Sequence, residues 1–186
     1  FLLLGSVNIS ASLGWSEITS QGAVGSPPYR HCFSAELFGP KLFVFAGHGG
    51  GANRNDLWEI DLSVETPTWS NTIANNDAGS PTARRCHTSV FYSNKMFIFG
   101  GYGSSKRNDL WEIDLSAMTP TWSNTISHGA IGSPSARTTH NMVLYGSKII
   151  LYGGQSTNDL WEMDLAASSP AWSVVIVDGA TGSPPV

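Results

Sequence analysis

The chain has 186 residues, and 41% of them are hydrophobic, which is enough to bury the core of one globular domain. Its net charge of −4 argues against binding to nucleic acid or to an anionic membrane surface, because both need clustered lysine and arginine. No apolar run approaches the roughly 20 residues of a membrane-spanning helix, so membrane insertion is not expected. The 20 glycines and 10 prolines favour turns and short strands over helices.

Residues 1–26 introduce two patterns that return later in the chain. Trp15 is followed by Ser, and the same pair stands at Trp69, Trp122 and Trp172, with spacings of 54, 53 and 50. Gly-Ser-Pro begins at position 25 and returns at 79, 132 and 182 with the same spacings. These residues are therefore predicted to be the end of a preceding repeat unit.

The same segment contains one acceptor sequence for N-linked glycosylation, Asn8-Ile9-Ser10. Such triplets also arise by chance, and two cysteines are too few for a disulfide framework. The sequon makes Asn8 a candidate glycosylation site. It favours a secreted or cell-surface location, while a cytoplasmic one stays open.

Three full units follow the first segment and share an almost invariant stretch. The decapeptide RNDLWEIDLS at 54–63 returns unchanged at 107–116, and as TNDLWEMDLA at 157–166. The predicted units, with the start of a further one, cover residues 27–78, 79–131, 132–181 and 182–186.

Each unit is predicted to contain four strands. In the middle unit the apolar or alternating runs cover residues 86–92, 96–101, 109–115 and 121–126. In the third run, alternation places Trp111, Ile113 and Leu115 on one side of the strand. No stretch shows helical spacing of apolar residues over a convincing length.

Four short strands repeating every roughly 50 residues are typical of a propeller blade. Each unit has an arginine, a pair of small residues after an apolar strand, an aromatic residue before an acidic one, and then tryptophan. This order resembles the kelch repeat, and the Trp-Asp pair of WD repeats does not occur. The predicted fold class is all-β, a kelch-type β-propeller of four-stranded antiparallel blades, present here as an incomplete arc within one domain.

A propeller closes with about four to eight blades, and proteins avoid open sheet edges. An incomplete arc of blades therefore has two possible explanations. We expect the chain to be an excerpt of a longer ring. The other interpretation is that copies associate to close a ring or to build a filament.

The repeated tryptophans and small-residue pairs are expected to be structural core. The tryptophans fill the wedge between blades, with sugar stacking as the alternative role. Glycine lets the chain turn, or lets a neighbouring backbone or aromatic ring approach where a side chain would clash. The core set is Trp15, Trp58, Trp69, Trp111, Trp122, Trp161, Trp172, Gly47, Gly100, Gly101, Gly153 and Gly154.

The kelch resemblance implies that residues at the start of the innermost strand line a shallow pocket at one mouth of the central channel. Three converging arginines there could hold carboxylates of a partner. The alternative is that each arginine pairs internally with a repeated acid such as Glu59, Glu112 or Glu162. The candidate binding residues from this strand are Arg30, His31, Arg84, Arg85, Arg137 and Thr139. Those from the variable loop after the small-residue pair are His48, Tyr102, Lys106 and Arg107.

No metal site or cofactor is predicted, because no two of the five histidines have metal-ligand spacing. His87 and His140 stand where the first unit has Phe33, which favours packing. Cys32 and Cys86 occupy equivalent places in adjacent units, and we expect two inert, partly buried thiols. A disulfide needs Cα atoms within about 7 Å, and neighbouring inner strands are expected to stand further apart.

The favoured function is a non-enzymatic scaffold that binds another protein through one face of the propeller. One alternative is a self-assembling structural component, extracellular in setting, whose blades are completed by other copies. A further alternative is a carbohydrate-active or oxidase-like kelch enzyme with catalytic residues outside this segment. No nucleophile-elbow motif or other catalytic set is visible in the sequence.

Overall fold

The computed structural model describes residues 16–20, 22–182 and 184, and these contain strands, turns and loops but no helix. The first sheet consists of β1 (Ser34–Phe38), β2 (Lys41–Gly49), β3 (Ala52–Asp61) and β4 (Trp69–Ile73). The second consists of β5 (Thr88–Tyr92), β6 (Lys95–Tyr102), β7 (Lys106–Asp114) and β8 (Trp122–Ile126). The third consists of β9 (Asn141–Tyr145), β10 (Lys148–Gly154), β11 (Thr157–Asp164) and β12 (Ser173–Ile176).

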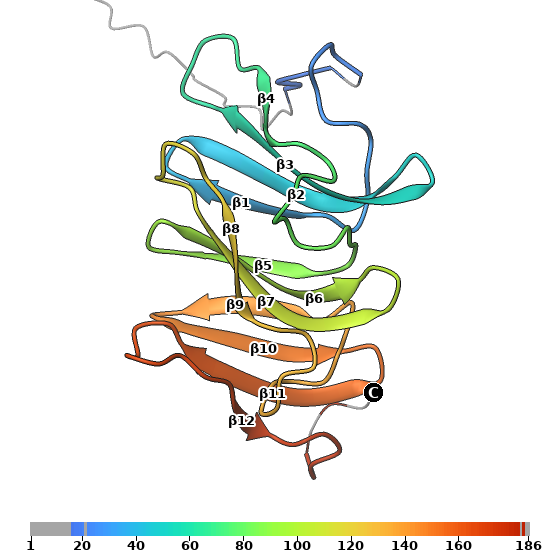
Figure 1. The fold of residues 1–186 in the computed structure, drawn as a ribbon, viewed down its shortest axis with the longest axis vertical. Coiled ribbons are helices and arrows are strands. Elements are labelled where there is room, and N and C mark those ends of the chain that lie inside the picture. The colour runs from blue at the N-terminus through green and yellow to red at the C-terminus, as the bar shows by residue number, and fades with distance from the viewer. Residues whose placement is uncertain (1–15, 21, 183, 185–186) are drawn as a thin grey trace, which may run out of the picture.

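Each sheet is an antiparallel meander in which consecutive strands are hydrogen-bonded neighbours (Figure 1). The prediction of four-stranded antiparallel blades is confirmed, and the sheets are called the first, second and third blade below. They lie within the predicted units 27–78, 79–131 and 132–181. In the partial units, at 1–26 and 182–186, the described residues contain no strand.

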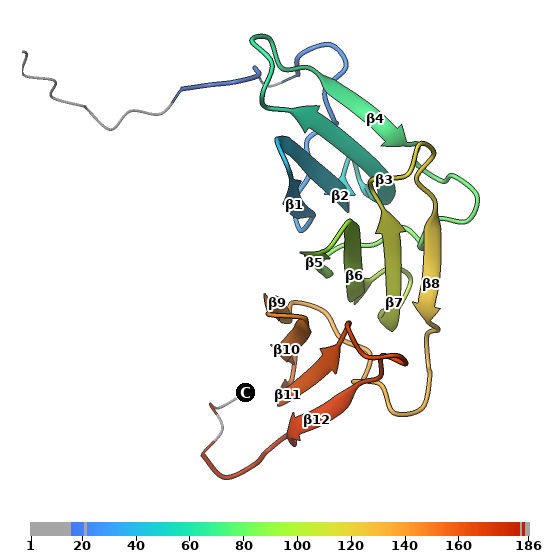
Figure 2. The same ribbon diagram turned by 90° about the vertical axis from the view of Figure 1, so that its left-hand side faces the viewer.

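The three blades are arranged side by side along an arc (Figure 2). The first strand of each blade lies on the concave side, and β5 contacts both β1 and β9. The last strands, β4, β8 and β12, lie on the convex side. The start of each inner strand therefore faces the region that becomes the central channel in a propeller.

The hydrophobic core lies between the blades. Phe43, Phe45 and Leu57 of the first blade pack against Ile98 and Ile113 of the second. A second cluster joins the next two blades, with Phe97, Phe99 and Leu110 against Ile149 and Leu151. Full burial of such side chains contributes about 1.5–3 kcal/mol each, so neighbouring blades stabilise one another.

Four of the repeated tryptophans belong to these interfaces, whereas Trp58 and Trp69 of the first blade are partly buried and lie in neither cluster. Trp122 lies 4.7 Å from Phe45 across the first interface, and Trp172 lies 5.2 Å from Phe99 across the second, measured between ring centroids. Trp111 and Trp161 also pack against the clusters. The predicted core residue Trp15 and the sequon at Asn8 lie outside the described residues.

Glycine in the small-residue pairs is required on two grounds. Gly101 has a φ of 91° and Gly47 one of 98°, in the left-handed region that L side chains rarely adopt. A Cβ at Gly101 would lie 2.8 Å from the carbonyl oxygen of Arg85, and one at Gly47 would lie 2.9 Å from that of His31. The pairs therefore let the inner-strand start approach the end of the second strand.

Within the part of the chain that the structure describes, no helix is long and apolar enough to cross a membrane.

Candidate functional site

The arginine that recurs in each unit is buried in a two-pronged ion pair. Arg84 donates from both terminal nitrogens to Asp109, at 2.8 Å to each carboxylate oxygen, and from Nη1 to the carbonyl of Gly100 at 2.9 Å. Its side chain is 0% exposed. The same pair forms in the other blades, as Arg30 with Asp56 and Arg137 with Asp159.

The prediction that these arginines contact a partner is therefore wrong for Arg30, Arg84 and Arg137. Their side chains are at most 4% exposed, so no partner carboxylate can reach them. The alternative of internal pairing holds, but with aspartate as the acid. The glutamates Glu59, Glu112 and Glu162 pair instead with Lys41, Lys95 and Lys148.

The aspartates in these pairs stay charged. Burial by itself raises the pKa of Asp109, but the hydrogen bonds and positive charge of Arg84 outweigh it and hold that pKa below its ordinary value. Trp111 adds to this by donating its indole N–H to the same carboxylate at 2.8 Å. Each pair thus ties the inner-strand start to the third strand of its own blade.

Other predicted residues do meet at the surface, where the inner strands start. His31 and His48 form an isolated backbone bridge and stack edge to face at 5.3 Å between ring centroids. Arg85 lies over the ring of Tyr102 at 5.2 Å and hydrogen-bonds with Nδ1 of His48 at 3.2 Å. The cluster therefore spans the first and second blades.

Asn53 belongs to the same cluster, although the sequence did not single it out. Its side-chain oxygen lies 3.0 Å from Nδ1 of His48 and 3.4 Å from Nη1 of Arg85. Its amide nitrogen donates to the carbonyl of Tyr102 at 3.3 Å. A signal was available, since Asn53 lies in the variable loop that also contributes His48.

Charge distinguishes this end of the blades. Of the 10 lysines and arginines, six form ion pairs, leaving four with no acidic partner among the described residues. All four lie close to the small-residue pairs. Arg54 is opposite Gly47 and Arg107 is opposite Gly101 in the strand register, and Lys106 and Arg85 both pair with Tyr102, the residue after Gly101. The four are Arg54, Arg85, Lys106 and Arg107. We call His31, His48, Asn53, Arg85, Tyr102, Lys106 and Arg107 the mouth surface.

Comparison with known proteins is consistent with this architecture. A model described as the KLHDC2/KLHL20/DRC7 Kelch-repeats domain matches residues 6–185. The chain belongs to the kelch-repeat family. It is 16% identical to the solved structure of YjhT, with a TM-score of 0.63 over 88% of this chain and 55% of that one, which supports the fold alone.

Several kelch relatives share about 30% of their residues with this chain. Adagio-like protein 1 of Oryza sativa subsp. japonica is 31% identical over 144 residues, which is 75% of this chain and 22% of the relative. Host cell factor 2 of Homo sapiens is 29% identical over 166 residues, covering 77% and 20%. Rab9 effector protein with kelch motifs of Mus musculus is 32% identical over 142 residues, covering 74% and 35%. The chain thus spans about a fifth to a third of these relatives' length.

The side chain of Thr139, the remaining predicted contact residue, donates to the carbonyl of Thr138 and forms no hydrogen bond with the described residues of the mouth surface. Thr139 is exposed, has a φ of 58°, and its backbone N–H donates to the carbonyl of Cys86 at 3.1 Å. Cys86 in turn donates to the carbonyl of Cys32 at 2.8 Å. This series of bonds links the inner-strand starts of the three kelch repeats.

Both cysteines are free thiols, but they lie closer together than expected. Burial raises the pKa of Cys86 to about 11, and the neighbouring Cys32 adds to the shift, so this thiol is unreactive at neutral pH. Cys32 is exposed rather than partly buried.

His87 and His140 lie in the interfaces between blades. His87 packs edge to face on Phe45 and lies 2.9 Å from the hydroxyl of Ser34, and His140 packs on Phe99. Burial lowers the pKa of His87 to about 3 and that of His140 to about 4, so both are neutral at pH 7. Among the described residues, no group of three or more His, Cys, Asp or Glu could hold a metal ion.

Proposed function

We propose that this chain is part of a non-enzymatic kelch propeller that binds a protein partner through the mouth surface. The observation that carries the proposal is the gathering of all four unpaired basic residues at that end of the blades. The side-chain hydrogen bonds of Arg85 all leave from Nη1, so its other N–H groups are available to a ligand. An acidic segment of a polypeptide fits this chemistry.

The relatives support a protein partner in general terms. One of them is a Rab9 effector with kelch motifs, a description that implies action on another protein. The enzyme alternative concerned residues outside this chain, and nothing in the described part tests it. The secreted or cell-surface location stays a prediction.

The test is binding of a fluorescein-labelled peptide of repeating Glu-Gly, measured by fluorescence anisotropy, beside a Gln-Gly peptide of equal length. Arg85→Ala combined with Tyr102→Ala should weaken binding by about tenfold or more, because hot-spot arginines and tyrosines carry most interface energy. Lys95→Ala, at the opposite end of the second blade, is the matched control and should leave binding unchanged. Equal binding of the Gln-Gly peptide, or an unaffected double variant, would refute the proposal.

The third blade has exposed apolar residues on a face that the next blade covers in the first two blades, and this favours a second association. Val143 is 57% exposed and Ile176 is 40% exposed, whereas the residues at the same repeat positions, Val90 and Ile73, are 5% and 6% exposed beneath the next blade. We propose that a further blade, from a longer chain or a second copy, covers this face. Light scattering on the 19.9 kDa chain should show a concentration-dependent rise in mass that Val143→Asp abolishes. A monomer at every concentration would exclude the second copy.

A further inference from the structure

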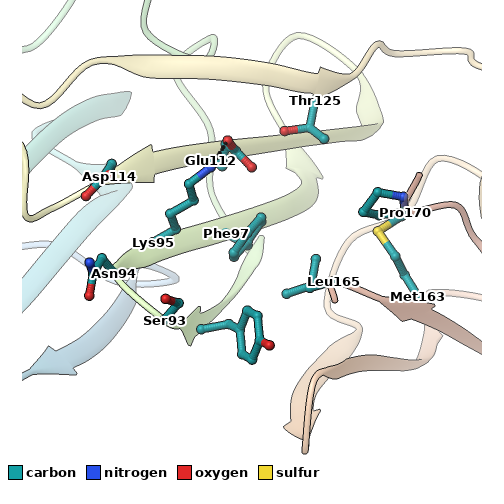
Figure 3. Close-up of a pocket in the computed structure, with 11 residues that line it drawn as sticks. Ser93, Asn94, Lys95, Phe97, Glu112, Asp114, Thr125, Met163, Leu165 and Pro170 are labelled. Atoms are coloured by element: carbon teal, nitrogen blue, oxygen red, sulfur yellow. Dashed lines mark hydrogen bonds and ion pairs between the residues drawn. The ribbon is translucent and has the colours of Figure 1, made fainter. Parts of the chain in front are cut away.

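A pocket of about 350 Å³ lies between the second and third blades, at the end opposite to the mouth surface (Figure 3). Phe97 of the second blade forms one wall, and Met163, Leu165 and Pro170 of the third blade form the other. Its volume is near the lower end of the about 300–1,000 Å³ typical of ligand pockets. The proposed function does not involve it.

The interface that contains the pocket differs from the first interface in its aromatic residues. Between the first and second blades, Phe38 stacks on Phe91 with ring centroids 4.8 Å apart and an interplanar angle of 29°. Tyr92 takes the position of Phe38 in the next interface, as both end the inner strand opposite a lysine. Leu144 takes the position of Phe91, because each is the last but one residue of the inner strand of its blade. The second interface therefore lacks the stacked pair, and Tyr92 lines the pocket.

The rim of the pocket is acidic. Lys95 donates to one oxygen of Glu112 at 2.6 Å, and Asp114 lies beside them, so these three charges sum to −1. Hydrogen bonds from Ser116 hold the pKa of Asp114 below its ordinary value, which keeps this carboxylate charged at neutral pH. The side chain of Lys95 is 42% exposed, so it can move aside for an incoming cation at low cost.

The same end of every blade has more acids than bases. A lysine begins the second strand, and a glutamate and an aspartate end the third strand, in each unit. The acids are Glu59, Asp61, Glu112, Asp114, Glu162 and Asp164, and the bases are Lys41, Lys95 and Lys148. A basic ligand is therefore attracted to this end, whereas the mouth surface repels it.

We propose that this pocket binds an arginine side chain from an extended segment of a partner protein. The aliphatic part of arginine matches the apolar walls, and its guanidinium can pair with the carboxylates of Glu112 and Asp114. The guanidinium is planar and more weakly hydrated than an ammonium, so it also stacks on aromatic rings such as that of Tyr92. An acidic pocket with an aromatic wall is complementary to this side chain.

The probe is a capped Gly-Arg-Gly peptide, titrated while the methionine methyl groups are followed by NMR. Met163 is the only one of the four methionines that lines the pocket, so its methyl signal should shift in a saturable way. The methyl signals of Met96, Met118 and Met142 serve as internal references. A peptide with citrulline, the uncharged counterpart of arginine, should leave the Met163 signal unchanged.

Two variants test the origin of the pocket. Leu144→Phe restores the aromatic residue present at the first interface and should abolish the Met163 shift. Glu112→Gln should weaken binding about fivefold, the upper end for a partly exposed ion pair, while Glu59→Gln in the first blade should have no effect. Dispersed methyl signals confirm that each variant is folded. Equal binding of the citrulline peptide, or full binding by Leu144→Phe and Glu112→Gln, would overturn the proposal.

Discussion

Replacing Arg84 with alanine should destabilise the fold strongly, although sequence reasoning alone allowed this residue to be a surface contact. The wild-type side chain donates five hydrogen bonds, two of them to Asp109, and is fully buried. Its removal leaves the Asp109 carboxylate buried without a countercharge. Breaking one side of a buried pair costs about 3–5 kcal/mol, a large part of a total stability of about 5–15 kcal/mol.

The assay is urea unfolding followed by tryptophan fluorescence. With a slope of about 2 kcal/mol per molar urea, the midpoint for Arg84→Ala should fall by about 1.5–2.5 M. Lys95→Ala is the matched control, because its ion pair with Glu112 is as short, at 2.6 Å, but Lys95 is 42% exposed. That control should lose about 0.2–1 kcal/mol. A loss for Arg84→Ala no larger than for Lys95→Ala would refute the structural role of the arginine.

The pH dependence gives an independent check on the same pair. Because Arg84 holds the folded-state pKa of Asp109 below its ordinary value of about 4, the ion pair stabilises the fold above that pH. Its contribution is lost as the pH falls through the folded-state pKa. The stability difference between the wild type and Arg84→Ala should therefore be largest near pH 7 and should shrink below about pH 4.

Two further predictions concern the blade interfaces and the glycine pairs. The pKa of His140 is lowered to about 4 from an ordinary value of 6.5, so acidification from pH 6.5 to 4 should cost about 3 kcal/mol through His140, beside a further loss through His87, whose pKa is lowered to about 3. His140→Phe should remove most of the His140 part and leave the His87 part, as measured by urea unfolding at several pH values, and an unchanged pH slope would contradict burial of a neutral imidazole. Gly132→Ala, with a φ of 82° and open space around the site, should cost about 1 kcal/mol. Gly101→Ala, with a φ of 91° and a backbone oxygen 2.8 Å from the added Cβ, should cost at least about 1 kcal/mol more. Equal losses for the two glycine variants would show that the backbone contact does not matter.

The strands could be predicted because their signals are local. Alternation along 109–115 placed Trp111, Ile113 and Leu115 on one side, and in the structure all three pack at the interface with the first blade. Leu110, on the other side, packs towards the third blade. A strand fixes these directions by its period of two, so no tertiary information was needed.

The partner of each arginine could not be predicted in this way. Asp56 and Glu59 both recur in every unit, so recurrence gave no reason to prefer either one. They are three residues apart on β3, which places them on opposite faces and about 10 Å apart along the strand. Only the packed sheet shows that the inner strand begins at the aspartate end, where Arg30 can reach Asp56.

The sequence by itself determined the repeat, the four strands of each blade, the glycine pairs and four of the seven predicted core tryptophans, because these follow from spacing and alternation within one unit. The tertiary structure decided which side chains meet, both within a blade and between blades. It buried Arg30, Arg84 and Arg137, and it left the basic residues of the mouth surface unpaired. It also opened a pocket between the second and third blades, an interface that lacks the stacked aromatic pair of the first one. These features depend on how the strands of one blade, and the faces of neighbouring blades, pack together, and such distances cannot be read from the spacing of residues in a repeat.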